Sequence, residues 1–558
     1  MKSKLSEIIS RQLKAMELEP PAEILLETPK AKDHGDLSSN VAMVMAKAAK
    51  RKPQELAQEL AQRLGAERYI EKVEVKGPGF LNFFLKPEAY HDSLKELWQD
   101  PNALKGVDLG KGKKVLVEFV SANPTGPMHV GHGRNAVVGD CLARLLENTG
   151  FKVTREFYVN DHGVQIQTLG RSGSHYHMVL TQVGGVTAAL PEDVYRGEYL
   201  EELVKELQGE IDKVKDDPLK VGKLLGVELL EVIKEELLRL GILFDHYFSE
   251  SSLYLGGKID EALDVLRARG LTYEQEGALW FKTSEFGDDK DRVLIKSDNT
   301  YTYLTPDIAY HKEKFDRPFD IYLNVMGADH GGYVQRLKAA VAALGHDPAK
   351  LQFLLMQLVN LKRGGEVVNM SKRTGDYVTL HEVIDEVGKD ATRFFFMMRS
   401  HNAALDFDLE LAKQRSAENP VYYIQYAHAR MCSIFRKAEE AGFPKAELLG
   451  EVDLGPLNLP EELELIGTLL AYSDMLGEAV KHYEPHRVAF YLLDLAKTFQ
   501  NYYTRAKSDD RYRVLSPQRE RTLAKLYLVK TLLEIFRSGL HILGVGAPES
   551  MTREEEEI

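Results

Sequence analysis

The sequence predicts a multidomain α/β protein, in which a doubly wound parallel (Rossmann-like) sheet follows a small α+β domain and precedes an all-α domain. Three observations support this fold class. The chain has 558 residues, which is too long for a single hydrophobic core. From Val115 onward, short apolar runs alternate with amphipathic stretches, as in a parallel sheet with crossover helices. Beyond about residue 385, long helical patterns replace the strand signals.

We therefore expect three domains, at 1–105, 106–385 and 386–558, the second with a mainly helical insertion at about 171–270. The first domain begins with an amphipathic helix and ends with an alternating strand in VEVKGPGFLNFFL. The polar stretch DPNALKGVDLGKGKK is the expected linker to the second domain.

Within the second domain, VLVEF is the first buried strand, and residues 134–146 form the helix that follows it. Further strands are expected at DRVLIK, YTYLT, FDIYLNVM and LQFLLMQLV. A hairpin is expected around Gly364 and Gly365, and the charged TREEEEI tail is expected to be solvated.

The overall composition excludes several classes of protein. A net charge of -13 argues against non-specific coating of nucleic acid, although not against a local basic face. Cys141 and Cys432 lie far apart in apolar helical contexts, which indicates a reducing compartment without a disulfide framework. The N-terminus lacks an apolar signal region, and no apolar stretch is long enough to span a bilayer. We expect a cytoplasmic protein without a membrane partner.

The junction after the first strand, SANPTGPMHVGHGRNAVVGD, holds His129, Gly131 and His132. A Pro/Gly loop that leaves a parallel strand and enters a helix is where nucleotides bind in open α/β sheets. The glycine would allow close approach of a ligand, and the histidines could donate to phosphate oxygens. Taken alone, the pattern is more often an ordinary polar loop. A zinc site is disfavoured, because the spacing is not that of H-E-x-x-H and no cysteine cluster completes it.

A second feature, VVNMSKRTGD at residues 367–376, supplies mobile cationic donors of the kind that a triphosphate needs. Alone it is a common exposed charge cluster. The order of the two features, H-x-G-H and then M-S-K, resembles the class I aminoacyl-tRNA synthetases with their HIGH-type and KMSKS-type motifs. Asn369 stands in place of the first lysine, and Lys372 matches the second, which the resemblance implies steadies the pyrophosphate. The implied catalytic residues are His129, Gly131, His132, Ser371 and Lys372, and Met128, Val130 and Met370 are implied to contact ATP.

Longer stretches resemble the bacterial type of arginyl-tRNA synthetase in particular. They are EFVSANPTGPMHVGHGR, YVNDHGVQI, YTYLTPDIAYH, GADHGGYV and NPVYYIQYAHAR. The resemblance implies that Tyr303 and Asp307 read the guanidinium of arginine, while Glu118 and Asn123 orient the amino acid. A guanidinium is planar and always charged, so carboxylates suit it. On spacing alone, Glu118 could instead pair with a lysine, and Asp307 fits an ordinary first turn of a helix.

Two further groups of residues follow from the same resemblance. Gly327, Asp329 and His330 come after the strand FDIYLNVM and are candidates for the ATP ribose, the alternative being a plain turn. The N-terminal domain resembles the one that contacts the tRNA D-loop, and the C-terminal domain the one that binds the anticodon. The tRNA-binding candidates are Phe80, Asn82, Tyr422, Gln425, Tyr426, His428 and Arg430. The alternative is that part of each set is core.

We expect an arginine–tRNA ligase that forms arginyl-adenylate and then charges tRNA(Arg), with tRNA bound before the adenylate forms. Its partners would be L-arginine, tRNA(Arg) and ATP with Mg²⁺ carried by the phosphates, without a structural metal. We expect a monomer. Two rivals remain: a nucleotidylyltransferase of similar core, and a tRNA-binding paralogue without catalysis, which only the altered Asn369 supports.

Overall fold

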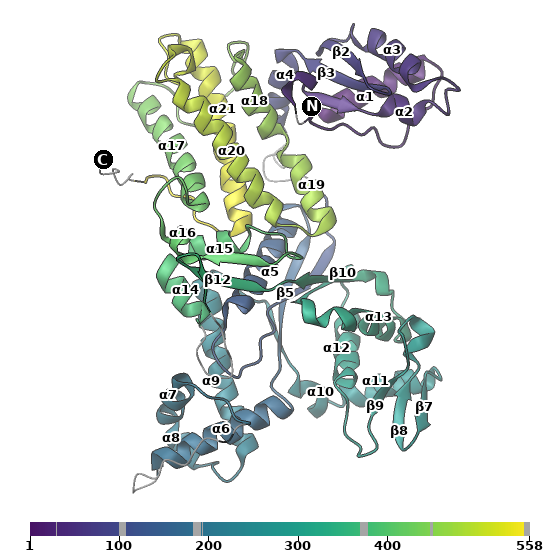
Figure 1. Ribbon diagram of the computed structural model, residues 1–558, viewed down its shortest axis with the longest axis vertical. Coiled ribbons are helices and arrows are strands. Elements are labelled where there is room, and N and C mark those ends of the chain that lie inside the picture. Colours follow the sequence, from purple (N-terminus) through teal and green to yellow (C-terminus); the bar gives the residue numbers. More distant parts are fainter. Residues whose placement is uncertain are drawn as a thin grey trace.

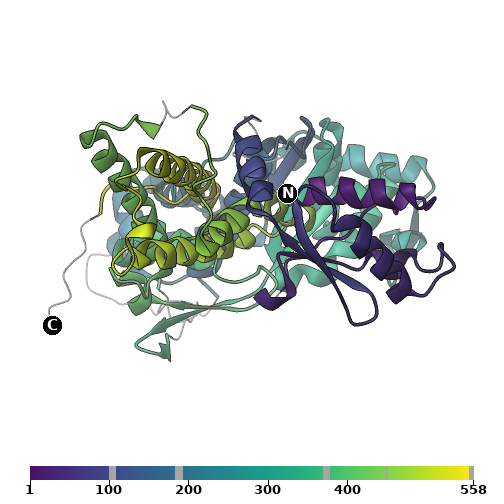
Figure 2. The same ribbon diagram turned by 90° about the horizontal axis from the view of Figure 1, so that it is seen from above.

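The computed structural model describes residues 1–29, 31–99, 108–181, 191, 193–368, 378–446 and 450–551. A parallel sheet lies near the centre of the molecule (Figure 1). The N-terminal domain and the long C-terminal helices lie at one end, and two lobes extend from the other end (Figure 1). Seen from above, the N-terminal domain lies beside the C-terminal helices (Figure 2). Within the described residues, no helix has the length and hydrophobicity needed to cross a membrane.

The central sheet has five parallel strands in the order β11-β10-β4-β5-β6. The strands and the helices that connect them are β4 (Lys114–Glu118), α5 (Val130–Asn148), β5 (Lys152–Val159), β6 (His246–Ser249), β10 (Ile321–Gly327), α13 (Val334–Ala343) and β11 (Leu351–Met356). The chain adds β5 and β6 on one side of β4 and then crosses to add β10 and β11 on the other. The strand order therefore reverses beside β4, and the carboxyl ends of β4 and β10 form the crevice where ligands bind in such sheets.

Two lobes are inserted into this alternation. The first is α6 (Val164–Thr181), α7 (Glu198–Glu206), α8 (Gln208–Asp212) and α9 (Pro218–Arg239). The second is α10 (Ser251–Leu255), α11 (Lys258–Ala268), β7 (Thr272–Gln275), β8 (Ala278–Phe281), β9 (Arg292–Ile295) and α12 (Leu304–Asp316). The short strand β6 lies between them and pairs with β5, so the stretch expected to be inserted contributes one strand to the central sheet.

Two strand predictions need correction, and a third strand lies outside the central sheet. DRVLIK forms β9 as predicted, and β9 pairs with β8 in a separate antiparallel sheet, β7-β8-β9. YTYLT is not a strand, because only Tyr301 makes a bridge, to Ile295, before α12 begins at Leu304. The Thr-Pro-Asp sequence that follows favours a first helical turn over an extended chain. LQFLLMQLV divides into β11 and β12 (Val359–Arg363), and β12 forms the predicted hairpin with β13 (Glu366–Val367).

The N-terminal domain is a three-stranded antiparallel sheet, in the order β1-β3-β2, with four helices around it. Its elements are α1 (Lys2–Ala15), β1 (Leu37–Ser39), α2 (Val41–Met45), α3 (Pro53–Leu64), β2 (Ile70–Lys76), β3 (Phe80–Leu85) and α4 (Pro87–Gln99). Leu5, Ile9 and Leu13 are the buried stripe of α1, as the helical spacing predicts.

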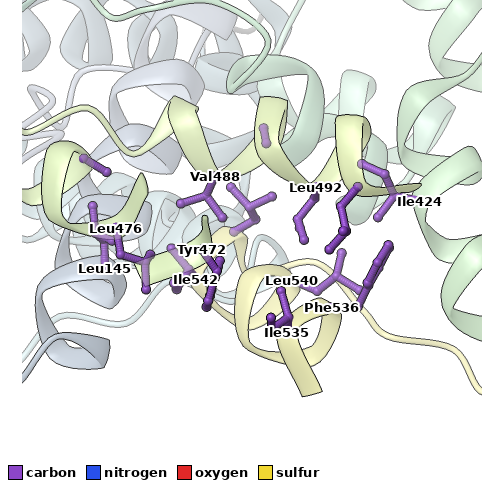
Figure 3. Close-up of a cluster of buried hydrophobic side chains, with 14 of the residues drawn as sticks. Leu145, Ile424, Tyr472, Leu476, Val488, Leu492, Ile535, Phe536, Leu540 and Ile542 are labelled. Atoms are coloured by element: carbon purple, nitrogen blue, oxygen red, sulfur yellow. The ribbon is translucent and has the colours of Figure 1, made fainter. Parts of the chain in front are cut away.

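After the hairpin the chain becomes mainly helical. The elements are α14 (Leu380–Val387), α15 (Lys389–Phe396), β14 (Leu405–Asp408), α16 (Leu409–Lys413), α17 (Pro420–Glu440), α18 (Pro460–Leu470), α19 (Tyr472–His482), α20 (His486–Arg505) and α21 (Arg519–Leu543). In Figure 3, Leu145 of α5 lies close to Leu476 of α19, within one cluster of buried side chains. The core of the C-terminal helices is therefore continuous with that of the central domain, and the predicted fold class is confirmed.

A buried ion pair lies at this junction. Arg393 of α15 donates to Asp140 of α5 at 2.6 Å, to the main-chain oxygen of Leu543 at 2.7 Å and to that of Leu240 at 2.9 Å. Both charged side chains are almost fully buried. One guanidinium thus ties together the middle of α5, the last turn of α21 and the end of α9.

Candidate active site and nucleic-acid pocket

His129 caps the N-terminus of α5. Its Nδ1 accepts hydrogen bonds from the main-chain N–H groups of Gly131 at 3.1 Å and His132 at 3.3 Å. The two imidazole rings of the H-x-G-H segment (residues 129–132) stack with their centroids 3.8 Å apart. A Cβ atom at position 131 would lie 2.9 Å from Cε1 of His129, so the segment requires glycine there. Because Nδ1 of His129 is an acceptor, the proton of the neutral ring lies on Nε2.

The loop between β4 and this segment has a strained backbone. Val120 and Ser121 have φ values of 66° and 43°, a region that β-branched residues rarely occupy. Asn135 of α5 holds the loop in place, because its Oδ1 accepts from the N–H of Val120 at 2.7 Å and its Nδ2 donates to the oxygen of Val325. Backbone strain of this kind clusters at ligand sites. Sequence reasoning did not single out Asn135.

The H-x-G-H segment is also bonded to the start of α14. The N–H of Leu380 donates to the oxygen of Met128 at 2.8 Å, and Thr379 forms a β-bridge with His129. Thr379 and Glu382 form a capping box that fixes the first turn of α14. The predicted residues Asn369, Met370, Ser371 and Lys372 lie outside the described residues. The described chain nevertheless resumes at Val378, immediately beside the histidines.

Glu118 ends β4 in register with Asn324 of β10, at the crevice where the strand order reverses. Its carboxylate accepts from Nζ of Lys314 at 2.5 Å, and the same ammonium donates to Oδ1 of Asn324 at 2.8 Å. Lys314 is completely buried on α12. Glu118 therefore already has a cationic partner, which is the alternative that its strand-end position left open.

Glu156, the neighbour of Glu118 on β5, is also neutralised within the protein. Arg317 binds it through both terminal nitrogens, and Tyr310 and His246 also contact its carboxylate. Burial alone would raise the pKa of Glu156, but the hydrogen bonds and positive charge around it prevail and lower the pKa to about 2. This carboxylate is ionised and fully occupied.

Asp307 and Glu250 form the remaining acidic part of the crevice. Burial, reinforced by the charge of Glu118, raises the pKa of Asp307 to about 7, although Tyr333 donates to its Oδ2 at 2.7 Å. Burial, reinforced by Asp307 and Asp161, likewise raises the pKa of Glu250 to about 7. Among the described residues, neither carboxylate forms a salt bridge. The charge of Asp307 contributes to the raised pKa of Glu250, so the two carboxylates influence each other, and sequence reasoning did not find Glu250.

The other predicted arginine-binding residues are less enclosed. Asn123 is half-buried in the loop before the H-x-G-H segment. Tyr303 precedes α12 and is 84% exposed, so its ring is not packed against the pocket. Tyr333, rather than Tyr303, makes the hydrogen bond to Asp307.

The predicted ATP-binding residues lie along the carboxyl edge of the sheet. Gly327 ends β10, and a Cβ atom there would lie 2.3 Å from Oδ1 of Asp329. Asp329 and His330 follow in a short 3₁₀ helix with exposed side chains. The side chains of Met128 and Val130 are buried, so only their main-chain atoms could contact a ligand.

A cavity of about 760 Å³ lies between α17 and α20 in the C-terminal domain. Tyr422, Tyr426 and Arg430 line it from α17, at the four-residue spacing that places side chains on one helical face. The guanidinium of Arg430 lies between two rings, 4.6 Å from the centre of Tyr426 and 4.7 Å from that of Tyr503. Basic residues surround the mouth of this aromatic pocket; those that line it are Arg415, Lys437, Lys507 and Arg513.

The side chains of the four other tRNA-binding candidates differ in how far they are exposed. Gln425 donates to Asp390 and to the oxygen of Gly546, and buried His428 contacts the oxygen of Pro548. These two side chains hold the end of the chain and do not line the aromatic pocket. In the N-terminal domain Phe80 is 40% exposed, whereas Asn82 is buried and accepts from the hydroxyl of Ser38 at 2.9 Å.

Within the described residues, no group of three or more His, Cys, Asp or Glu side chains could hold a metal ion. The described part of the site offers acidic, imidazole and main-chain groups to a ligand.

Three family models match the chain. They are described as "tRNA synthetases class I (R), catalytic domain", over residues 95–433, "DALR anticodon binding domain", over 424–551, and "Arginyl tRNA synthetase N terminal domain", over 3–85. Curated relatives named arginine–tRNA ligase include that of Syntrophotalea carbinolica, 47% identical over 95% of both chains. That of Geobacter sp. strain M21 is 46% identical over 96% of both.

Solved structures of aminoacyl-tRNA synthetases also resemble this chain. The arginyl-tRNA synthetase of Thermus thermophilus superposes with a TM-score of 0.77 at 27% identity, covering 99% of this chain and 100% of that chain. The methionyl-tRNA synthetase of Mycobacterium tuberculosis shares the fold alone, with a TM-score of 0.55 at 12% identity, covering 77% of this chain and 91% of that chain.

Proposed function

Because the chain belongs to the arginyl-tRNA synthetase family and is an arginine–tRNA ligase, we propose how its residues carry out the two steps of that reaction. In the first step, a carboxylate oxygen of L-arginine attacks the α-phosphorus of ATP, the bond to the β-phosphate breaks, and arginyl-adenylate and pyrophosphate form. In the second step, a ribose hydroxyl of the terminal adenosine of tRNA(Arg) attacks the arginyl carbonyl carbon and AMP leaves.

Asp307 and Glu250 bind the guanidinium of arginine. This assignment is supported by which carboxylates of the crevice are already paired with a cation. Lys314 neutralises Glu118 and Arg317 neutralises Glu156, whereas Asp307 and Glu250 form no salt bridge among the described residues and can share an incoming cation. A planar guanidinium with five donors can bridge both of them. Glu118, held by Lys314, and Asn123 then orient the amino acid end at the carboxyl edge of β4, and Tyr303 closes over the ligand from its exposed position.

His129 and His132 stabilise the negative charge that develops on the phosphates. Nδ1 of His129 accepts from two main-chain donors, so Nε2 is the ring nitrogen that would donate to a phosphate oxygen. Gly131 lets the nucleotide approach the main chain of Met128 and Val130. Gly327, Asp329 and His330 bind the ribose at the adjoining strand end, and Met370, Ser371 and Lys372 contact the phosphates. Mg²⁺ would enter with ATP, and the phosphates would supply most of its ligands.

Tyr422, Tyr426 and Arg430 bind unstacked bases of the tRNA in the aromatic pocket, with phosphates on its basic rim. Gln425 and His428 support this helix from its other side. Phe80 contacts the tRNA from the N-terminal domain, and buried Asn82 acts there only by holding its strand through Ser38. We further propose a cytoplasmic monomer in which tRNA binds before the adenylate forms.

Pyrophosphate exchange into ATP, measured with each of the twenty amino acids with and without tRNA(Arg), tests this proposal. Exchange with arginine alone, and only when tRNA is present, is the expected result. Exchange without tRNA would contradict the ordered mechanism. Exchange with another amino acid would refute the assignment of the pocket, and no exchange from folded protein would refute the catalytic roles.

A further inference from the structure

Helix α9 of the first lobe places a buried carboxylate behind the H-x-G-H segment. Glu236 is 3% exposed, and its Oε2 accepts a hydrogen bond from the main-chain N–H of Met128 at 3.1 Å. We propose that Glu236 is a positioning residue, which holds the main chain of the H-x-G-H segment at the place where ATP reacts. This proposal rests on the proposed roles of His129 and His132.

The environment of Glu236 is unfavourable for a carboxylate. Burial raises its pKa to about 7, against the effects of the Met128 N–H and of Arg239 one turn further along α9. Arg239 is itself engaged with His381 and Asp385 of α14. A buried acid with this little compensation costs stability, and an apolar side chain would pack at lower cost. The need to hold the H-x-G-H segment explains why a glutamate lies at position 236 better than a contribution to folding does.

A second contact joins the first lobe to the same loop. The hydroxyl of Tyr199 on α7 donates to the oxygen of Thr125 at 2.8 Å. A Cβ atom at Gly126 would lie 3.0 Å from that hydroxyl, so a larger residue there would crowd this contact. The first lobe therefore holds the loop at two points, Thr125 and Met128.

Helix α9 also contacts α14, which begins at Leu380. Arg239 binds His381 and Asp385 in the first two turns of α14, while Leu380 of that helix donates to the oxygen of Met128. Both peptide groups of Met128 are therefore restrained, its N–H by α9 and its oxygen by α14. A displacement of about 1 Å at reacting groups can cost on the order of a hundredfold in rate.

The test compares Glu236→Leu with Glu236→Gln in the full-length enzyme. Glutamine keeps an acceptor oxygen for the Met128 N–H, and leucine does not. We expect Glu236→Leu to lower kcat of tRNA-dependent pyrophosphate exchange by roughly 10- to 100-fold, with the KM for arginine and tRNA within about twofold of wild type. Glu236→Gln should restore kcat to within about threefold of wild type.

Leu229→Ala, a buried position on α9 in the core of the first lobe, is the control for destabilisation. It should lower the unfolding midpoint and leave kcat unchanged. Wild-type kcat in Glu236→Leu, an equal loss in both Glu236 variants, or a loss confined to KM would each overturn the proposal. Should Glu236→Leu fail to fold, Glu236→Met, which is close to glutamate in volume but lacks its acceptor oxygen, replaces it, and a wild-type kcat there would also overturn the proposal. Exchange by the wild type is the separate test of the proposed function.

Discussion

Replacing Asp307 with asparagine should make the free enzyme more stable and its arginine binding much weaker. Burial raises the pKa of Asp307 from its ordinary value of 3.8 to about 7, which corresponds to about 4 kcal/mol of unfavourable ionisation at pH 7. Asparagine carries no charge and can still accept from the hydroxyl of Tyr333. We therefore expect Asp307→Asn to raise the free energy of unfolding by up to about 4 kcal/mol.

The free energy of unfolding should depend on pH because the pKa of Asp307 is raised in the folded state. The folded state binds a proton at Asp307 more tightly than the unfolded state, so stability falls as pH rises from about 4 to about 7 and then levels off. The stability difference between variant and wild type should accordingly vanish near pH 4. In the wild type, the KM for arginine should fall as pH rises through about 7, because Asp307 and Glu250 must both ionise to bind the guanidinium.

Arginine should bind more weakly to the Asp307→Asn enzyme, although the free enzyme becomes more stable. Loss of one carboxylate from a desolvated ion pair costs about 2–5 kcal/mol, so the KM for arginine should rise by roughly 30- to 5000-fold. Urea denaturation without ligands and exchange kinetics with varied arginine measure the two effects. Asp316→Asn is the control, because Asp316 lies at the end of the same helix in an exposed pair with Lys312. A less stable Asp307→Asn enzyme, or one with an unchanged KM for arginine, would refute the reasoning.

Three further substitutions test other parts of the molecule. Lys314→Met leaves Glu118 as a buried charge without its cation, so the free energy of unfolding measured in urea should fall by about 3–5 kcal/mol; an unchanged value would contradict the pairing. Gly131→Ala places a Cβ atom 2.9 Å from Cε1 of His129. It should lower kcat of exchange by roughly 10- to 100-fold, and full activity would show that the ring position is unimportant. Tyr426→Ala removes a stacking surface and should raise the KM for tRNA by roughly 5- to 150-fold in aminoacylation, whereas the KM for arginine should not change.

The strands of the central sheet could be predicted where an apolar run and a following helix agree, as at VLVEF and FDIYLNVM. HYFS gave no such signal, because β6 is short and lies at the edge of the sheet. YTYLT was misleading, because its aromatic residues suit a strand while the next three residues start a helix. Local patterns decide where a helix begins, whereas the sheet to which a strand belongs depends on contacts distant in sequence.

The H-x-G-H segment could be recognised in the sequence because its residues are adjacent in the chain. The residues that set the charge of the crevice and the position of this segment could not be predicted from the sequence. Lys314 is 196 residues from Glu118, and Glu236 is 108 residues from Met128, so only the folded chain reveals these partners. Glu250 sits in the unremarkable sequence SESS and gains its raised pKa from burial and from Asp307. Sequence comparison identified the family, and tertiary packing defines the pocket.

The guanidinium of Arg393 has a consequence for the choice of RNA. It joins the last turn of α21 to the middle of α5, whose first turn carries the histidines. Asp140 lies eight residues beyond His132, a helical rise of about 12 Å. The C-terminal helices and the helix that carries the histidines are thus tied by buried hydrogen bonds and share one core, which opposes a change in the separation between the aromatic pocket and the reacting groups. We expect the enzyme to select tRNA by the span between its anticodon and its acceptor end, so that an RNA with correct bases but an altered span would be charged poorly.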